Sequence, residues 1–367
     1  MQAIVRPMRD SDFEAAWLTV RLGAIAENYK SFRRMAGSAA VAGVVKADGY
    51  GLGAEFIAPA LAAAGCDTFF VARLEEGIAL RRVLPEIRIF VLDGAPRDAV
   101  PALIAHRLMP VLNSLSQIAD FAEGASGPRD AAIHIDTGMN RLGVPPDELS
   151  LLAAEWRTRL KNIHPVLLMS HLACGDEAKS KMNETQLTRF RAALAMLPPA
   201  PASLAASGGA YLGAAYHFDL IRPGIGLYGG APQEGGPALR TAAVISARVL
   251  QTRRIDRGES VGYAATFHAK RPAMLATVAL GYAGGIPRSL SNKGIAHAAG
   301  GRVSYVGRVS MDMIVLDVTE LADVKVGDVV ELLGDHVLLE DMASLAGTNA
   351  YEILTGLKLP RHYVDAV

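Results

Sequence analysis

Residues 44–53 read VVKADGYGLG, a β-branched run that ends in one lysine and is followed at once by a glycine-rich turn. β-Branched residues favour strands, and glycine lets the backbone approach a ligand closely. A lysine at the end of a buried strand is costly, because burial disfavours its charge. Lys46 therefore suits amine chemistry with a carbonyl compound, which needs a partly desolvated lysine. Read alone, the stretch also fits an ordinary lysine whose charged end reaches solvent past a turn.

A strand–helix rhythm extends outward from this stretch. Apolar segments alternate with alanine- and leucine-rich helical segments, which indicates parallel βαβ units. Eight strands within about 190 residues fit a (β/α)8 barrel better than an open sheet. An open doubly wound sheet is the alternative, but no Gly-x-Gly-x-x-Gly motif opens the first helix. The expected strands are Val41–Ala47, Thr68–Ala72, Ile87–Leu92, Met109–Asn113, Ala131–Asp136, His164–Ser170, Ala202–Ala206 and Leu220–Tyr228.

The rhythm changes near residue 240. From Ala242 onward, strands such as Glu259–Phe267 follow one another without long helices, and one helix over Leu339–Leu357 closes the chain. This pattern predicts a separate domain. The expected fold class is α/β, a (β/α)8 TIM-like barrel followed by a mostly antiparallel β domain. The predicted limits are a leader at 1–15, the barrel at 16–239, with a first short strand at Trp17–Leu22, and the β domain at 240–367.

The composition argues against several kinds of partner. Lysine plus arginine equals aspartate plus glutamate, 37 each, so neither nucleic acid nor an anionic membrane is favoured. Cys66 and Cys174 are too few for a disulfide framework and suggest a reducing cytoplasm. The nine histidines lack metal-ligand spacing, so no metal is expected. No signal peptide and no run of ~18 apolar residues is present, which makes a cytoplasmic protein the expectation.

Polar motifs fall at the predicted carboxyl ends of the barrel strands, where such barrels place functional groups. Lys46 ends the first strand, His171 the sixth and Ser207 the seventh, while Arg222 and Gly224 lie in the eighth. Loops after strands seven and eight often hold a phosphate, which Ser207 and the amides around Gly224 suit. A cofactor with a phosphate and an aldehyde fits both features, and pyridoxal phosphate is the natural candidate. Taken singly, His171 could be a core histidine, Arg222 an ion-pair residue and Ser207 a helix N-cap.

Seven motifs are spread along the chain. They are VKADGYGLG (45–53), DTGM (136–139) with RLG (141–143), SHLA (170–173), RPGI (222–225), VGY (261–263), GYA (281–283) and GRVSMD (307–312). Their order and spacing resemble the alanine racemase family, pyridoxal-phosphate enzymes built from a barrel and a β domain. The resemblance runs from about Trp17 to Arg361. It implies a homodimer with shared active sites that interconverts L-alanine and D-alanine by two-base proton transfer on the cofactor-bound substrate.

The resemblance also implies the two bases. Lys46 holds the cofactor as a Schiff base and acts on the D face of the substrate, and Tyr263 acts on the L face from the other subunit. A free tyrosine titrates near ~10, so Tyr263 needs help to act as a base near neutrality. His171, linked to Arg222, supplies that help through hydrogen bonds. Arg222 also faces the ring nitrogen of the cofactor and keeps it unprotonated, because arginine does not give up its proton.

The remaining implied roles concern the phosphate and the substrate. The residues that bind the cofactor phosphate are Tyr50, Ser207, Gly224 and Ile225. Arg141 and the backbone at Met311 hold the substrate carboxylate. Tyr282, Arg308 and Asp176 line the access corridor. The implied substrate-binding residues are Arg141, Met311, Asp312 and Tyr282.

Several positions depart from the family pattern. His134 stands where many members have a lysine that can be carbamylated and orients the arginine equivalent to Arg141. Asp136 or a bound anion could substitute for that lysine. Gly284 and Ile286 replace family residues near the corridor, and they favour the alternative of a serine or broad-specificity racemase.

Two other classes fit less well. Decarboxylases with the same architecture are expected to carry a cysteine in the C-terminal domain, whereas both cysteines here precede residue 240. A non-enzymatic cofactor-binding barrel would lack the β domain.

Overall fold

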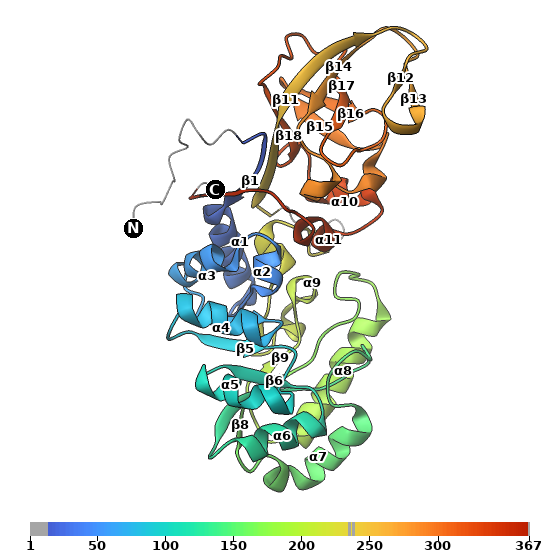
Figure 1. The fold of residues 1–367 in the computed structure, drawn as a ribbon. Coiled ribbons are helices and arrows are strands. Elements are labelled where there is room, and N and C mark those ends of the chain that lie inside the picture. Colours follow the sequence, from blue (N-terminus) through green and yellow to red (C-terminus); the bar gives the residue numbers. More distant parts are fainter. Residues whose placement is uncertain (1–13, 234–235, 237–238, 366–367) are drawn as a thin grey trace. The chain divides into compact units, whose positions relative to one another are not determined.

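The computed structural model describes residues 14–233, 236 and 239–365. The chain divides into two compact units, which we describe separately (Figure 1). The first is built on Ala26–Leu227 and the second on Leu239–Val367. Residues 14–25 belong to the second unit, although they precede the first in sequence.

The first unit is a barrel of parallel strands. Seven strands pair in the order of the chain, and β10 (Leu220–Ile221) pairs with β2 (Ala40–Val41). A parallel bridge from Ala206 to Arg222 joins the segments that follow β9 and β10, so the ring closes. The seven strands are β3 (Gly43–Val44), β4 (Thr68–Val71), β5 (Arg88–Val91), β6 (Met109–Leu112), β7 (Arg129–His134), β8 (Ile163–Met169) and β9 (Ala202–Ser203). All four residues of β4 are buried, as expected for a parallel strand covered on both faces.

Helices connect these strands, and their starts follow local chemistry. Ser114 caps α6 (Leu115–Gly124) by accepting the Gln117 amide at 3.2 Å. Proline occupies the first turn of α7 (Pro146–Arg159), where no amide donor is needed. The other helices of this unit include α3 (Ala54–Ala63), α4 (Leu74–Val83), α5 (Val100–Ala105), α8 (Lys181–Met196) and the short α9 (Ser207–Ala210).

The second unit is a closed antiparallel barrel with two added strands. The long β11 (Ala243–Ile255) pairs with both β14 (Ala273–Val278) and β18 (Val329–Leu333), which closes six strands into a ring. A bulge between Val249 and Gln251 bends β11 so that it can take part in both pairings. The other strands of the ring are β15 (Ile295–Ala298), β16 (Gly301–Tyr305) and β17 (Ile314–Asp317).

Both strand systems confirm the predicted fold class, with local differences. The predicted strand Leu220–Tyr228 is wrong beyond Ile221, because Pro223 cannot donate a ladder hydrogen bond and residues 225–228 form a 3-10 turn. The predicted strand Glu259–Phe267 is two short strands, β12 (Ser260–Val261) and β13 (Phe267–His268), with Tyr263 in the turn between them. The predicted last helix is also two: Gly347, with φ 74°, ends α10 (Leu339–Ala346) before α11 (Ala350–Thr355).

The predicted strand Trp17–Leu22 corresponds to β1 (Ala16–Arg21), which the structure places in the sheet of the second unit. There β1 pairs with β11 on one side and with β19 (Arg361–Val364) on the other. Sequence order does not reveal this placement, because the pairing partners lie more than two hundred residues away. The predicted domain limits themselves remain predictions.

Candidate functional site

Lys46 lies directly after β3, at the start of a left-handed turn. Val45 still donates its amide to Phe70 O at 2.9 Å, and Lys46 then begins α2 (Lys46–Tyr50). The four residues from Ala47 to Tyr50 have φ of 53°, 53°, 63° and 57°. Only Gly49 adopts such a conformation freely, and each of the other three costs roughly 1–2 kcal/mol. Backbone strain of this kind is concentrated at functional sites.

The environment of Lys46 disfavours its charge. Burial lowers the pKa of Lys46, and the positive charge of Arg141 lowers it further, while Glu76 and Asp93 act in the opposite direction. The lysine is half-buried at the carboxyl end of a barrel strand. A neutral amine is therefore more accessible here than on a free lysine, as the physical argument from the sequence expects.

Arg222 is the buried centre of the rim. It is 3% exposed and donates hydrogen bonds to Ser203 Oγ and, at 2.7 Å, to Ser170 O. Burial lowers the pKa of Arg222 to about 9, so the guanidinium remains charged at neutral pH. Its Nη2 lies 3.5 Å from Nδ1 of His171.

This contact decides the tautomer of His171. Arginine can only donate, so Nδ1 of His171 must be the acceptor, and the proton of the neutral ring is on Nε2. Burial and the charge of Arg222 both hold the pKa of His171 well below 6.5, which keeps the ring neutral. His171 therefore presents an N–H donor on its other edge.

Donor groups converge beside the carboxyl ends of the seventh and eighth strands. The hydroxyl of Ser207 accepts the amides of Gly224 and Gly226 at 2.8 and 3.2 Å. A Cβ atom at Gly224 would lie 2.1 Å from the Tyr50 hydroxyl, so Tyr50 is pressed against this backbone and position 224 must be glycine. The two hydroxyls lie at one point, and the Ser207 oxygen, which already accepts two amides, keeps its own proton to donate, so this cradle suits a phosphate group. Ile225, at 2% exposure, forms its buried floor.

Asp136 holds the loop that leads to Arg141. One of its carboxylate oxygens accepts the amides of Gly138, Met139 and Asn140 at 2.8, 3.0 and 3.2 Å. Asp136 thus shapes the backbone of this loop, and the structure shows no hydrogen bond donated to it by the guanidinium of Arg141.

His134 is buried beside this loop and pairs with Asn113. Asn113 Nδ2 donates to Leu92 O and Val111 O, so its Oδ1 faces Nδ1 of His134 at 2.7 Å and accepts from it. Burial lowers the pKa of His134 to about 4, and the charge of Arg222 adds to this effect. His134 is therefore neutral near pH 7, with Nε2 as an acceptor.

Sequence reasoning missed a buried polar network beneath the rim. Gln186 of α8 is 0% exposed, and its Nε2 donates to Thr137 Oγ1 and His171 O at 3.0 and 2.9 Å. Its Oε1 accepts the Ala173 amide at 2.8 Å, and Thr137 Oγ1 lies 2.8 Å from Ser170 Oγ. The available signal was a glutamine on the apolar face of α8, where a buried amide must find partners.

The predicted residues that follow residue 240 in sequence lie on loops of the second unit, whereas Asp176 belongs to the first. Tyr282 donates its amide to Ser310 O at 3.0 Å, and Ala283 donates to Met311 O at 2.9 Å. A Cβ at Gly262 would contact the backbone of Arg308 at 3.5 Å, which brings the turn of Tyr263 to the same loops. The structure therefore gathers four predicted residues into one exposed group: Tyr263, Tyr282, Met311 and Asp312.

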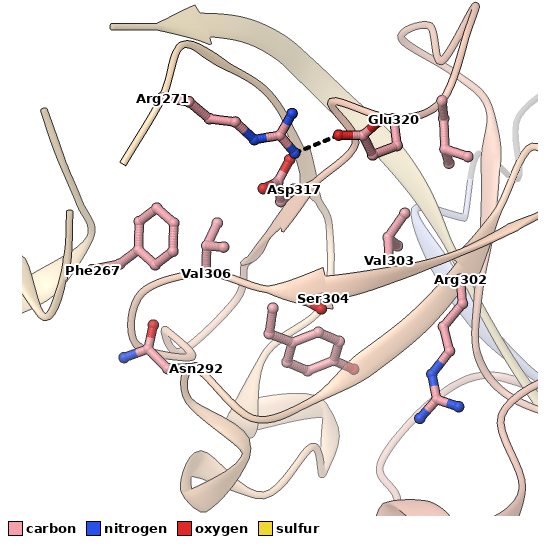
Figure 2. A pocket seen from close by; sticks show the side chains of 11 residues that line it. Phe267, Arg271, Asn292, Arg302, Val303, Ser304, Val306, Asp317 and Glu320 are labelled. Atoms are coloured by element: carbon pink, nitrogen blue, oxygen red, sulfur yellow. Dashed lines mark ion pairs between the residues drawn. The ribbon is translucent and has the colours of Figure 1, made fainter. Parts of the chain in front are cut away.

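Figure 2 shows a separate hollow of about 320 Å³ in the second unit. Its walls combine apolar side chains such as Phe267 and Val306 with charged ones, and Arg271 forms an ion pair with Glu320 at 2.5 Å. The opposite charges in this hollow neutralise each other, and no predicted site residue lines it. We do not include it in the candidate site.

Further observations concern the described part of the chain. No helix there is long and apolar enough to cross a membrane. Within the same residues, no cluster of three or more His, Cys, Asp or Glu side chains could hold a metal ion. Cys66 is buried, Cys174 is half-buried, and neither forms a disulfide.

Comparisons with known proteins agree with these features. Two family models match the chain, "Alanine racemase, N-terminal domain" over residues 20–232 and "Alanine racemase, C-terminal domain" over residues 242–363. A catabolic alanine racemase of Agrobacterium fabrum is 46% identical over 95% of this chain and 92% of its own length. An alanine racemase of Rhodospirillum rubrum is 45% identical over 97% of this chain and 98% of its own length.

A solved structure matches as well. The alanine racemase of Bartonella henselae, crystallised with covalently bound pyridoxal phosphate, has a TM-score of 0.92 and 40% identity, and the match covers 96% of this chain and 100% of that one. Full-length similarity in both sequence and fold leads to one conclusion: the chain belongs to the alanine racemase family.

Proposed function

We propose that this protein interconverts L-alanine and D-alanine with pyridoxal 5'-phosphate as its cofactor. The observation that carries the proposal is a half-buried lysine of lowered pKa, Lys46, at the same barrel rim as the cradle that contains the Ser207 and Tyr50 hydroxyls. The lysine suits the aldehyde of the cofactor and the cradle suits its phosphate. The relatives named above as alanine racemases support the substrate.

The residues of the barrel would hold the cofactor at both ends. Tyr50, Ser207, Gly224 and Ile225 bind its phosphate, and Arg222 faces its ring nitrogen. When bound, pyridoxal phosphate withdraws electrons from the Cα atom of the amino acid and makes its proton easier to remove. Lys46 Nζ takes up or delivers that proton on one face, for which its lowered pKa is suited.

Racemisation needs a second proton-transfer group on the opposite face, and we assign it to Tyr263. His171 presents Nε2–H because Arg222 donates to its Nδ1, so it can donate to a phenolate and make Tyr263 a stronger acid. Tyr263 is 70% exposed on its own unit. We propose that it reaches the site of a second copy, so that the enzyme is a homodimer with shared active sites.

The substrate carboxylate would be bound by Arg141 and the backbone at Met311, with Asp312 and Tyr282 nearby. The loop held by Asp136 brings Arg141 to the barrel rim, where its charge acts on Lys46 and His171. A cytoplasmic location remains the expectation from the two unpaired cysteines.

The features that favoured a serine or broad-specificity racemase give that alternative little support. Ile286 is 1% exposed and belongs to the core of its unit. A Cβ at Gly284 would lie 2.3 Å from the side chain of Leu280, so packing explains this glycine. Alanine therefore remains the proposed substrate.

The test is a substrate panel. Purified protein with added pyridoxal phosphate is incubated with L-alanine, L-serine or L-lysine, and the D-enantiomer is measured by chiral chromatography. We expect alanine to be turned over fastest. Equal or faster turnover of serine or lysine would contradict the proposed substrate, and absence of any D-product would contradict the proposed activity.

A further inference from the structure

The left-handed turn after Lys46 is held from outside by one carboxylate. Glu76 of α4 accepts the amide of Ala47, the first residue after the lysine, at 2.7 Å through Oε1. Its Oε2 accepts the amides of Ala72 and Arg73 at 2.7 and 3.2 Å. One side chain thus joins the backbone at the carboxyl ends of two neighbouring barrel strands, β3 and β4.

Helix capping explains only half of this arrangement. A glutamate at the third position of α4 that accepts the amide of Arg73 completes a capping box. The bond to Ala47 lies outside that motif, because Ala47 is 29 residues away in the chain. It acts on the first of five successive residues with positive φ, from Ala47 to Gly51, a conformation that persists in non-glycine residues only when its surroundings determine it.

The position of the carboxylate matters electrically as well. Three charged groups act on Lys46 besides burial, which has the largest effect: Arg141 disfavours the charged form, whereas Glu76 and Asp93 favour it. Glu76 is the one of these that also bonds to the adjacent backbone. Other hydrogen bonds support the far end of the turn, since Asp48 Oδ1 accepts the Ala54 amide at 2.9 Å.

We propose that Glu76 is a positioning residue that holds the strained turn and thereby aims Lys46 at the cofactor and Tyr50 at the phosphate cradle. The inference rests on the proposed function, in which Lys46 carries the cofactor. Glu76 touches neither substrate nor cofactor in this account. It acts through the backbone on which both side chains are mounted.

The test compares Glu76→Gln with Glu75→Gln. Glu75 is the preceding residue of the same helix, is exposed, and has only a loose ion pair with Arg73 at 3.8 Å, so its replacement controls for the loss of one negative charge on α4. Glutamine has only one accepting oxygen, so in Glu76→Gln the side chain cannot accept the amide of Ala47 and also the amides of Ala72 and Arg73 that follow β4. We expect kcat for alanine to fall about 10- to 100-fold with a smaller change in KM, as for a misplaced catalytic group. Glu75→Gln should stay within about twofold.

Two further measurements separate positioning from general damage. Hydrogen exchange of the peptide that spans residues 46–53 should be faster in Glu76→Gln than in Glu75→Gln, with or without cofactor. In the holoenzyme of Glu76→Gln, the visible absorbance of the bound cofactor is followed as the pH is raised. The pH at the midpoint of its change should be lower than in the wild type, because the carboxylate that favours a protonated nitrogen at Lys46 is gone. Glu76→Asp keeps the charge but shortens the reach, so it should restore that midpoint without restoring kcat.

The outcomes distinguish this inference from the proposed function. If Glu76→Gln matches Glu75→Gln in exchange, kcat and absorbance, the inference is overturned and the proposed function stands. If Glu76→Gln does not fold, Glu76→Asp decides: unchanged exchange over residues 46–53 together with unchanged kcat overturns the inference. If the wild type neither takes up pyridoxal phosphate nor racemises alanine, the proposed function fails, and with it the role assigned to Glu76.

Discussion

The ionisable side chains at the barrel rim share one physical situation, in which burial disfavours the charged form. Lys46, His134 and His171 all have a lowered pKa, and in each case burial is the largest cause. Arg222 keeps its charge because its donors are satisfied by Ser203 and Ser170. The result is two fixed positive charges, on Arg222 and Arg141, beside two neutral histidines and a lysine whose charged form is disfavoured, an arrangement suited to proton transfer.

His134 should make the stability of the protein fall in acid. Its pKa is about 4 in the folded chain, below the ordinary 6.5, so the unfolded chain binds more protons between these values. Stability is complete above pH 6.5 and is lost as the pH falls toward 4, by about 2 kcal/mol between pH 7 and 5. His134→Gln should remove this part of the pH dependence of the thermal unfolding midpoint.

The matched control is His164→Gln. His164 is exposed and pairs with Asp130 at the surface, so its replacement should leave the slope between pH 7 and 5 intact. Equal slopes in wild type, His134→Gln and His164→Gln would show that His134 is not held neutral by the fold.

Gly224→Ala should weaken cofactor binding. A methyl group at this position would lie 2.1 Å from the Tyr50 hydroxyl, so either the tyrosine or the cradle must move. We expect the dissociation constant of pyridoxal phosphate to rise about 10-fold or more, equivalent to about 1.4 kcal/mol, as measured by fluorescence or absorbance titration. Gly127→Ala, where a methyl group meets no neighbour within 4 Å, is the control. An unchanged affinity in Gly224→Ala would contradict the cradle.

At the scale of elements, the residues of the site lie at the ends of barrel strands, and side chains from two helices bind the loops that carry them. The strands bring Lys46, His171 and Arg222 to one rim, while α4 and α8 contribute side chains that fix the loops. Glu76 of α4 binds the turn after β3, and Gln186 of α8 binds the loops after β7 and β8. Each helix thus secures neighbouring strand ends through one polar side chain.

Gln186→Leu should cost both stability and activity. The change leaves the His171 carbonyl, the Ala173 amide and the Thr137 hydroxyl without their partner in a buried region. An unsatisfied buried group costs about 1–3 kcal/mol, so we expect a clearly lower unfolding midpoint together with a lower kcat.

Glu184→Gln, an exposed change on the same helix, should leave both quantities unchanged. If Gln186→Leu were as stable and as active as this control, the network would have no role in holding His171.

At the scale of the whole molecule, the chain builds two closed barrels, one parallel and one antiparallel. In both rings each strand is paired on both sides, so neither ring offers an open edge to other chains. Each ring is therefore a rigid scaffold for loops that carry exposed functional side chains. The proposed bases are divided between the two units, Lys46 on the first and Tyr263 on the second. A shared site between two copies follows from the proposed homodimer.

Mixing two inactive variants should restore activity if the site is shared. Lys46→Ala and Tyr263→Phe should each lose about 10²- to 10⁴-fold in racemisation, as expected when a general base is removed. Co-expressed or re-associated copies form hybrids in about half of all dimers, and each hybrid has one intact site of two. Activity should then recover to about a quarter of the wild type.

The control is either variant mixed with itself, which should stay inactive. If the mixed sample also stays inactive although hybrids are detected by mass spectrometry, Tyr263 acts within its own chain or not at all.

The sequence by itself determined the fold class and predicted most of the candidate residues at the rim. Continuous apolar runs separated by helical segments indicate parallel strands, and a lysine beside glycines can be picked out as a candidate because few residue types form a Schiff base with a carbonyl compound. Only the tertiary structure decided that β1 belongs to the sheet of the second unit and that a left-handed turn follows Lys46. It also decided which groups Glu76, Asn113 and Gln186 bind. These depend on contacts between segments far apart in the chain, and such contacts are set by closure of the barrels and by the need of every buried polar group for a partner.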